Sequence, residues 1–315
     1  MKVAALSLEL SEFASLFGCA VEEIPEDCTE LIARHDFSYR IADGAERDEI
    51  LLGVLKKIDS GELSIAGEDR LPHWEKGWGE NLEAFSRSKN ISDLLPKYFR
   101  PGLPLRLFQN YILPTDPNFE SNWYSIFRLW LFRTYFKEAK AIYEFGSGSG
   151  FNLPVLAALY PDKKIVGLDW AEASVDIANQ MGKVHGWRIE GRRFDFFKPD
   201  QTLVLEPQSV VTTIGALEQT GSRYKDFLNY LVDSRPALCV HVEPTVEWYD
   251  ENNLVDYAAI RFHKKRRYWE GFIDELRKLE REGRVKILKT KRSYFGSLFV
   301  EGYSQTIWKS LDKSK

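Results

Sequence analysis

Ile142–Gly150, with the sequence IYEFGSGSG, places three glycines at alternate positions directly after a short apolar run. We predict a β-strand over that run, Ala141–Phe145, and a helix over the segment that follows, Phe151–Tyr160. Glycines in a turn between a strand and a helix allow positive φ and let a ligand approach the backbone closely. The free N–H groups at the start of the helix favour an anionic or polar ligand group. The segment therefore predicts a nucleotide-binding turn.

The pattern of alternating strands and helices continues beyond this turn. Apolar runs predict strands at Lys164–Asp169, Trp187–Phe194, Ser209–Ile214 and Ala237–Glu243, with helices at Ala171–His185 and Tyr224–Asp233. A long helix over residues 253–282 and two strands, Val285–Tyr294 and Ser304–Trp308, follow. We predict a doubly wound α/β fold: a mostly parallel seven-stranded sheet that ends in an antiparallel C-terminal hairpin.

The first 120 residues show no such alternation. Helical spacing of apolar residues, as in Glu46–Ile58, is separated by glycines and prolines. We predict a mainly helical N-terminal substrate or lid region over residues 1–120 and a second domain over residues 121–315, which opens with a helix at Ser121–Ala139. The aromatic segment Trp74–Glu80 is either a lid over a ligand or a packed loop.

Three details narrow the ligand of the glycine turn. The dinucleotide fingerprint G-x-G-x-x-G/A would put Phe151 where close packing of helix and strand needs a small residue. Glu144, two residues before Gly146, would repel a pyrophosphate but suits a cationic ligand. Asp169 ends the next predicted strand, where an acid accepts both hydroxyls of a ribose. A ribose, an ammonium group and no phosphate describe S-adenosylmethionine.

Residues 120–310 resemble the class I S-adenosylmethionine-dependent methyltransferases. The resemblance rests on Glu144–Gly150 as the first motif, Gly167–Trp170 as the second, Arg193–Phe196 at the end of the third strand, Gly215–Gln219 after the fourth, and Ser304–Trp308 as the final antiparallel strand. It implies S-adenosylmethionine as cofactor. The expected cofactor-binding residues are Glu144, Gly146, Ser147, Gly148, Gly150, Asp169, Trp170, Asp195, Phe196 and Gly215.

Several of these residues also have a purely structural interpretation. The three glycines would serve a structural turn, and Asp169 would cap the helix that begins near Ala171. Trp170 either stacks on the adenine or packs in the core. Asp195 either holds the adenine amino group or forms a turn.

The candidate catalytic residues lie at or after the carboxyl ends of the fourth and fifth predicted strands, where open α/β sheets bind ligands. They are Glu218, Gln219, His241, Glu243 and Tyr249. His241 and Glu243 share one face of a strand and form either a general-base pair, half of a metal site or, for His241, part of the core. Gln219 stands where many relatives have His, which puts a general base in doubt. No metal site is predicted, because no Cys-x-x-Cys pair occurs.

A basic segment follows, Asp256–Tyr268, with Lys264, Lys265, Arg266 and Arg267 in succession. These cations are candidates for binding a phosphate or carboxylate on the substrate. Since four consecutive residues of a helix cannot all face one site, a solvated helix surface is the alternative.

The bulk composition favours a small-molecule acceptor. A net charge of −4 over 315 residues gives no overall attraction to a polyanion, so nucleic acid is not favoured as a partner. No window approaches the ~20 uncharged apolar residues that cross a bilayer, and three cysteines do not make a disulfide framework. We therefore expect a cytoplasmic protein with no membrane partner; its oligomeric state stays open.

Other functions are weighed against this one. A protein or nucleic-acid methyltransferase is an alternative, although Gly215–Glu218 lacks the Asn/Asp-Pro-Pro-Tyr/Phe motif of amino-methylating DNA enzymes. A non-catalytic S-adenosylmethionine-binding module and an NAD-dependent oxidoreductase are the others.

Overall fold

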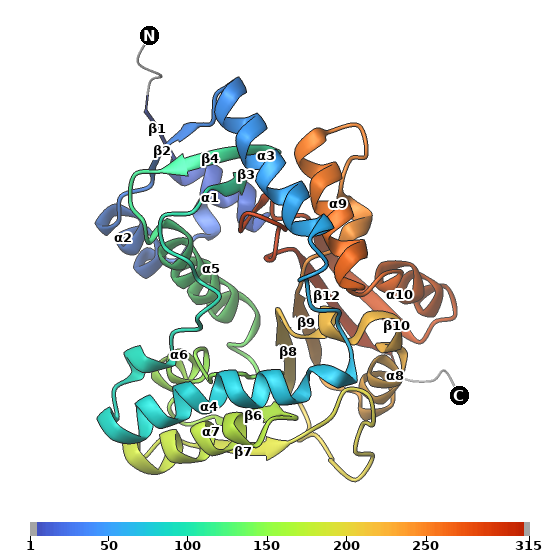
Figure 1. Cartoon of the computed structure of the whole chain (residues 1–315). Coiled ribbons are helices and arrows are strands. Elements are labelled where there is room, and N and C mark those ends of the chain that lie inside the picture. Colours follow the sequence, from blue (N-terminus) through green and yellow to red (C-terminus); the bar gives the residue numbers. More distant parts are fainter. Residues whose placement is uncertain (1–4, 312–315) are drawn as a thin grey trace.

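The glycine loop lies at the carboxyl end of the middle one of five parallel strands, within a seven-stranded sheet of the computed structural model, which describes residues 5–311 (Figure 1). In spatial order the strands are β10 (Val285–Lys291), β12 (Gln305–Ser310), β9 (Leu238–Val242), β8 (Val210–Ile214), β5 (Ala141–Phe145), β6 (Lys164–Asp169) and β7 (Ile189–Arg193). The strands from β9 to β7 are parallel, whereas β12 is antiparallel to both β9 and β10. The predicted fold class is confirmed.

Helices cover both faces of this sheet. They are α5 (Phe119–Tyr135), α6 (Leu153–Leu159) and α7 (Glu172–His185) on one face, and α8 (Lys225–Ser234) and α10 (Phe272–Arg281) on the other. Alternate residues of β5 enter the two cores, as period-two geometry requires. Ile142 packs in the core that includes Leu153 and Ile177, whereas Phe145 packs in the other, with its ring centroid 5.0 Å from that of Phe227. β5 is thus buried on both faces.

A second, antiparallel sheet belongs largely to the N-terminal region. Its strands, in spatial order, are β1 (Leu6–Ser7), β2 (Ser38–Ile41), β4 (Asn110–Pro114), β3 (Leu105–Leu107) and β11 (Phe295–Gly296). The prediction of a mainly helical region missed this sheet because its strands are too short to show a period of two. Its last strand comes from the C-terminal part of the chain, so the sheet takes in residues from both sides of the predicted boundary at residue 120.

The remaining helices surround these sheets. They are α1 (Leu10–Phe17), α2 (Glu26–Arg34), α3 (Gly44–Asp59), α4 (Leu71–Ser88) and α9 (Leu254–Arg266), with 3-10 turns η1 (Val21–Glu23), η2 (Glu68–Arg70), η3 (Ile91–Leu94), η4 (Leu217–Arg223) and η5 (Val246–Trp248). Within residues 5–311, no helix combines the length and apolar character needed to cross a membrane.

The single helix predicted over residues 253–282 is wrong. The chain leaves the helical conformation at Arg267 (φ 52°) and re-enters it after Gly271 (φ 78°), which separates α9 from α10. The break is fixed by tertiary bonds: the Trp269 N–H donates to the Glu218 carbonyl (3.1 Å), and the Trp269 indole donates to the Pro244 carbonyl (2.6 Å). This connection therefore packs against the turn that follows β8.

Helix α4 contains the aromatic segment Trp74–Glu80 and packs along α7 (Figure 1). The Glu75 carboxylate accepts the N–H groups of Glu172 (2.8 Å) and Ala173 (3.0 Å), at the N-terminus of α7, where helical N–H groups lack internal partners. Since α7 begins just after β6 ends, this contact holds the first half of α4 at the carboxyl edge of the large sheet.

Candidate active site

The glycine loop takes backbone conformations that only glycine adopts without strain. Gly146, Gly148 and Gly150 have φ of 76°, 53° and 72°. The Gly146 N–H donates to the Leu168 carbonyl at 2.7 Å, which ties the loop to β6. A Cβ atom on Gly146 would lie 2.3 Å from that of Ala216, so the turn after β8 approaches the loop as closely as a bare backbone permits.

Asp169, at the end of β6, is hydrogen-bonded to the glycine loop. Its two carboxylate oxygens accept the N–H groups of Gly148 and Ala171, each at 2.9 Å. Burial raises the pKa of Asp169 to about 6, although these N–H bonds oppose the shift. Each carboxylate oxygen has a second lone pair, so Asp169 still has the capacity to accept hydroxyl groups from a ligand.

Glu144, at the end of β5, is 2 % exposed, and only one of its two carboxyl oxygens has a hydrogen-bond partner. Its Oε1 accepts the Asn152 side-chain N–H at 2.6 Å, whereas its Oε2 is buried without a partner. The Asn152 carbonyl oxygen in turn accepts the Tyr124 hydroxyl at 2.8 Å. Burial raises the pKa of Glu144 to about 7, despite the nearby Asn152 and Arg128. A buried carboxyl oxygen without a donor is costly, and a ligand that brings a donor would satisfy it.

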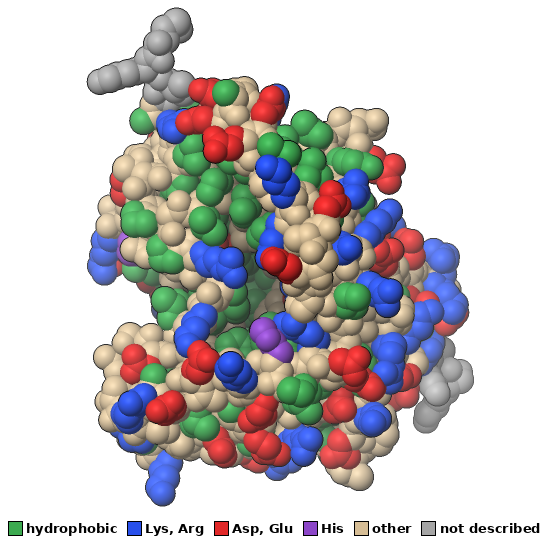
Figure 2. Space-filling model, viewed as in Figure 1, with side chains coloured by type: hydrophobic (Ala, Val, Ile, Leu, Met, Phe, Trp, Pro, Cys, Tyr) green, Lys and Arg blue, Asp and Glu red, His purple; other side chains and the backbone are tan. Residues whose placement is uncertain are grey.

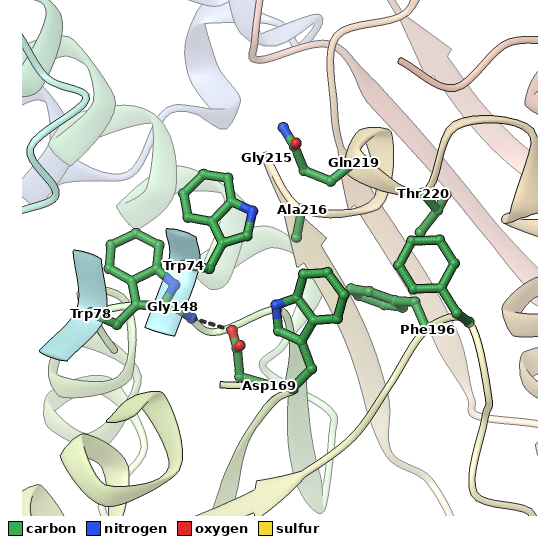
Figure 3. Close-up of a pocket in the computed structure, with 12 residues that line it drawn as sticks. Trp74, Trp78, Gly148, Asp169, Phe196, Gly215, Ala216, Gln219 and Thr220 are labelled. Carbon is green, nitrogen blue, oxygen red and sulfur yellow. Dashed lines mark hydrogen bonds between the residues drawn. The ribbon is translucent and has the colours of Figure 1, made fainter. Parts of the chain in front are cut away.

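A pocket opens above the loop and Asp169 (Figure 3). It holds about 500 Å³ of empty space, its open mouth included. Its lining residues are Trp74, Trp78, Gly146, Gly148, Asp169, Trp170, Phe196, Phe197, Gly215, Ala216, Gln219 and Thr220. Aromatic walls with one carboxylate and exposed backbone suit a flat ring joined to a polar, hydroxyl-bearing group.

The two tryptophans of α4 form one wall of this pocket. Their rings stack with centroids 5.5 Å apart, and Figure 3 shows Trp78 lying against Gly148. A Cβ on Gly148 would lie 2.9 Å from the nearest atom of the Trp78 indole. The loop face that glycine leaves open is therefore covered by Trp78. Neither tryptophan is among the predicted binding residues, because the contact joins segments 70 residues apart.

Glu243 supports the opposite wall without lining the pocket. Its carboxyl oxygens accept the N–H groups of Ala216 (3.1 Å) and Leu217 (3.1 Å), at the start of η4. Burial and the adjacent Glu218 raise the pKa of Glu243 well above its usual range. The Oε2 of Glu218 is buried and accepts no N–H. The arrangement favours a protonated Glu243 that donates to Glu218, and this pair holds the turn that carries Gln219.

His241 and Tyr249 also have partners away from the pocket. The Nδ1 of His241 lies 2.9 Å from the Thr213 hydroxyl, and burial lowers the pKa of His241 to about 3, so the ring is neutral. The Tyr249 hydroxyl accepts the Glu301 N–H at 2.9 Å, with the ring packed beside Arg106 and Arg292. His241 therefore fits its structural alternative, and neither side chain lines the pocket. Among residues 5–311, no three His, Cys, Asp or Glu side chains are grouped to hold a metal ion.

The structure brings most of the predicted residues together. Those that line the pocket are Gly146, Gly148, Asp169, Trp170, Phe196, Gly215 and Gln219. Those beside or beneath it are Glu144, Ser147, Gly150, Asp195 and Glu218; of these, Asp195 accepts the Phe197 N–H at 2.8 Å in a turn. Phe197, Ala216 and Thr220 also line the pocket but were not among the predicted site residues, and Trp74 and Trp78 were predicted only as part of a possible lid. Phe197 and Ala216 directly follow predicted residues, so their sequence position was a usable signal.

No protein-family model and no curated protein matches the sequence. Among solved structures, an S-adenosylmethionine-dependent methyltransferase from Aquifex aeolicus shares 16% identity over 57% of this chain and 86% of its own, with a TM-score of 0.38. Human N-acetylserotonin methyltransferase, in complex with S-adenosylmethionine, shares 12% identity over 86% of this chain and 68% of its own (TM-score 0.43). The methyltransferase domain of bacterial CtHen1-CN shares 20% identity over 58% and 97% (TM-score 0.42). Likeness this distant assigns no substrate.

The chain's own topology is more informative. Five parallel strands are followed by one antiparallel strand, β12, which inserts between β9 and β10. The glycine loop follows the central strand, and Asp169 ends its neighbour. The buried, partnerless oxygen of Glu144 fits the ammonium group of S-adenosylmethionine. The chain therefore has the fold of the class I S-adenosylmethionine-dependent methyltransferases.

Proposed function

We propose that this protein is an S-adenosylmethionine-dependent methyltransferase whose methyl acceptor is a small molecule. The observation that carries the proposal is the pairing of two buried carboxyl groups with one glycine loop. Asp169 binds the loop from β6 and faces the pocket, and Glu144 keeps one oxygen without a donor. A pyrophosphate would be repelled by Glu144, whereas an ammonium group and a ribose complement Glu144 and Asp169.

Each group then has a defined task in binding. Asp169 accepts the ribose hydroxyls, Glu144 receives the ammonium group, and Trp170 with Phe197, whose rings are 5.6 Å apart, holds the adenine. When bound, the cofactor supplies a methyl group that its sulfonium already activates. The protein's part is to orient the acceptor and to exclude water, which contributes about 7–11 kcal/mol in well-aligned reactions.

The helix that covers one side of the pocket supports the proposal that the methyl acceptor is a small molecule. Residues 1–120 supply α4, whose Trp74 and Trp78 close one side, and Glu75 fixes that helix to α7. We propose this region as the lid and substrate region. A pocket bounded on one side by a packed helix admits a small molecule more readily than a folded macromolecule.

Calorimetry tests the cofactor part of the proposal. S-adenosylhomocysteine, the stable product of the donor, is expected to bind and NAD⁺ is not. Binding of NAD⁺ without binding of S-adenosylhomocysteine would contradict the proposal.

The acceptor class is tested with S-adenosylmethionine labelled in its methyl group and a cell extract divided by size. Label is expected in the low-mass fraction only. Label transferred to the RNA, DNA or protein fractions would favour the macromolecular alternative.

A further inference from the structure

Two arginines meet beside the pocket from distant parts of the chain. Arg70 ends η2 and immediately precedes α4, and Arg266 is the last residue of α9. The Ala66 N–H donates to the Arg266 carbonyl at 2.8 Å, which ties the two segments together. Burial and the charge of Arg266 lower the pKa of Arg70, so the two guanidinium groups are close enough to repel each other.

Neither arginine is neutralised by a carboxylate. The Nε atoms of Arg70 and Arg266 are both buried without an acceptor, and no ion pair joins either side chain to another residue within 5–311. By contrast, the buried Arg106 and Arg292 both pair with Asp256, at 2.8 Å and 2.7 Å. Buried donors without acceptors are uncommon in proteins, and like charges held near each other repel. An anion would supply acceptors for both side chains.

The surroundings of the pair carry further positive charge. His73 lies one turn into α4, and burial together with Arg70, Arg266 and Lys76 lowers its pKa. All three of these charged neighbours are cations. Figure 2 shows Lys and Arg side chains gathered around the hollow at the centre of this face of the molecule. This local charge contrasts with the net charge of −4 of the whole chain.

The arginine pair adjoins the proposed cofactor site through two aromatic side chains. The Arg70 guanidinium lies 5.3 Å from the ring centroid of Trp74, which lines the pocket. The Arg266 guanidinium lies 5.0 Å from the ring of Tyr268, which lies beside Gln219, a residue of the opposite wall. A group held between the arginines is therefore next to both walls of the pocket.

The two planar guanidinium groups suit an oxyanion. Each presents its N–H donors in a fixed fork that matches a carboxylate or phosphoryl group, and stacking on Trp74 or Tyr268 holds that fork in place. Lys264, Lys265 and Arg267, which flank Arg266, are exposed and behave as the solvated helix surface that the sequence allowed. Arg266 is the only partly buried member of the run Lys264–Arg267, and its guanidinium lies against the Tyr268 ring.

We propose that Arg70 and Arg266 form an anion-binding subsite that holds a carboxylate or phosphoryl group of the methyl acceptor. The proposal rests on the proposed methyltransferase function and narrows its substrate to an anionic small molecule. It also assigns the N-terminal region a direct part in substrate recognition, because Arg70 belongs to that region.

Binding of simple anions tests the subsite without knowledge of the acceptor. Inorganic phosphate and acetate are titrated separately into the full-length protein at constant ionic strength, with tryptophan fluorescence as the readout because Trp74 lies under Arg70. We expect at least one anion to bind, and Arg70→Gln and Arg266→Gln each to weaken it about tenfold, or about 1.4 kcal/mol. The anion preferred distinguishes a phosphoryl from a carboxylate substrate.

Lys265→Gln is the matched control, since it removes the same charge from an exposed neighbour. It is expected to leave anion binding unchanged, and Arg70→Lys is expected to restore part of it. Binding of neither anion, or equal weakening by Lys265→Gln, would overturn the subsite.

The methylated product provides a second readout. The labelled low-mass product is expected to be retained on an anion-exchange resin, and its yield is expected to fall in both arginine variants. A neutral product would overturn the inference and leave the methyltransferase function intact. S-adenosylhomocysteine affinity is measured in every variant. Failure of the wild-type protein to bind it would count against the proposed function instead, so the two failures are distinguishable.

Discussion

The indole of Trp78 covers Gly148, so that a single Cβ atom added to that glycine would come within 2.9 Å of the ring. Gly148 is also the residue whose N–H donates to Asp169. A cofactor that approaches this backbone has to displace the indole. Part of the free energy of cofactor binding is therefore used to move the indole. The situation is that of a ligand whose binding-competent protein conformation is only rarely populated before it binds.

Replacing Trp78 with Ala is expected to remove this competition. S-adenosylhomocysteine should bind Trp78→Ala severalfold more tightly and associate faster, as stopped-flow fluorescence and calorimetry can measure. Trp187→Ala serves as the control, because Trp187 stacks on His185 and does not line the pocket. Weaker binding by the Trp78 variant alone would show that the indole contacts the ligand rather than excluding it.

Asp169→Ala is expected to weaken S-adenosylhomocysteine binding at least about tenfold, because it removes the acceptor for the ribose hydroxyls and for the Gly148 N–H. Asp195→Ala is the control variant, because Asp195 lies outside the pocket lining and its carboxylate accepts the Phe197 N–H. Calorimetry supplies both affinities and thermal unfolding shows whether each variant is folded. Unchanged affinity in a folded Asp169→Ala protein would remove Asp169 from the cofactor site.

Cofactor affinity is expected to depend on pH through Glu144. Because burial raises the pKa of Glu144 to about 7, the carboxyl is protonated below that pH and attracts a cation less. Affinity for S-adenosylhomocysteine should therefore fall as pH decreases below about 7, by up to about tenfold per pH unit, and Glu144→Gln should flatten the profile.

Glu120→Gln provides the control for this pH profile. Burial also raises the pKa of Glu120 to about 7, but its carboxylate accepts the Tyr303 hydroxyl instead of facing the glycine loop. The profile should persist in this variant. Its disappearance there, together with its survival in Glu144→Gln, would contradict the role given to Glu144.

Glu243→Gln is expected to fold normally, because an amide reproduces both the acceptor for the Leu217 N–H and the donor to Glu218. Glu243→Ala leaves those groups unpaired and should lower the free energy of unfolding by about 1–3 kcal/mol. Since the folded protein raises the pKa of Glu243, its contribution to stability is present at low pH and is lost as pH rises. Urea unfolding should show a steeper alkaline loss for the wild type than for Glu243→Gln; parallel curves would refute the protonated pair.

The local parts of the fold were predictable from sequence. The predicted strands Ala141–Phe145 and Lys164–Asp169 match β5 and β6 at both ends. Their ends could be predicted because a glycine follows the first run and charged residues bound the second. Arg267 gave no such signal: its left-handed conformation depends on the packing of Trp269 against the turn after β8.

The pocket residues also fall into a predictable and an unpredictable group. Loop glycines and Asp169 are motif residues, whereas the Trp78 contact and the partners of Glu243 arise only when distant segments meet.

The position of β11 constrains the order in which the chain can fold during its synthesis. β3 has paired on one side with β4 by residue 114, but its other edge has no partner until residues 295–296 have been made. Until then that edge presents free N–H and C=O groups, which are a template for pairing with other chains. The first half of the described chain is therefore an unfinished, association-prone unit on the ribosome, because the two sheets are completed only when β11 and β12, within residues 295–310, have been made. Synthesis of residues 295–310, rather than the folding of an independent N-terminal domain, is the event that protects the nascent chain.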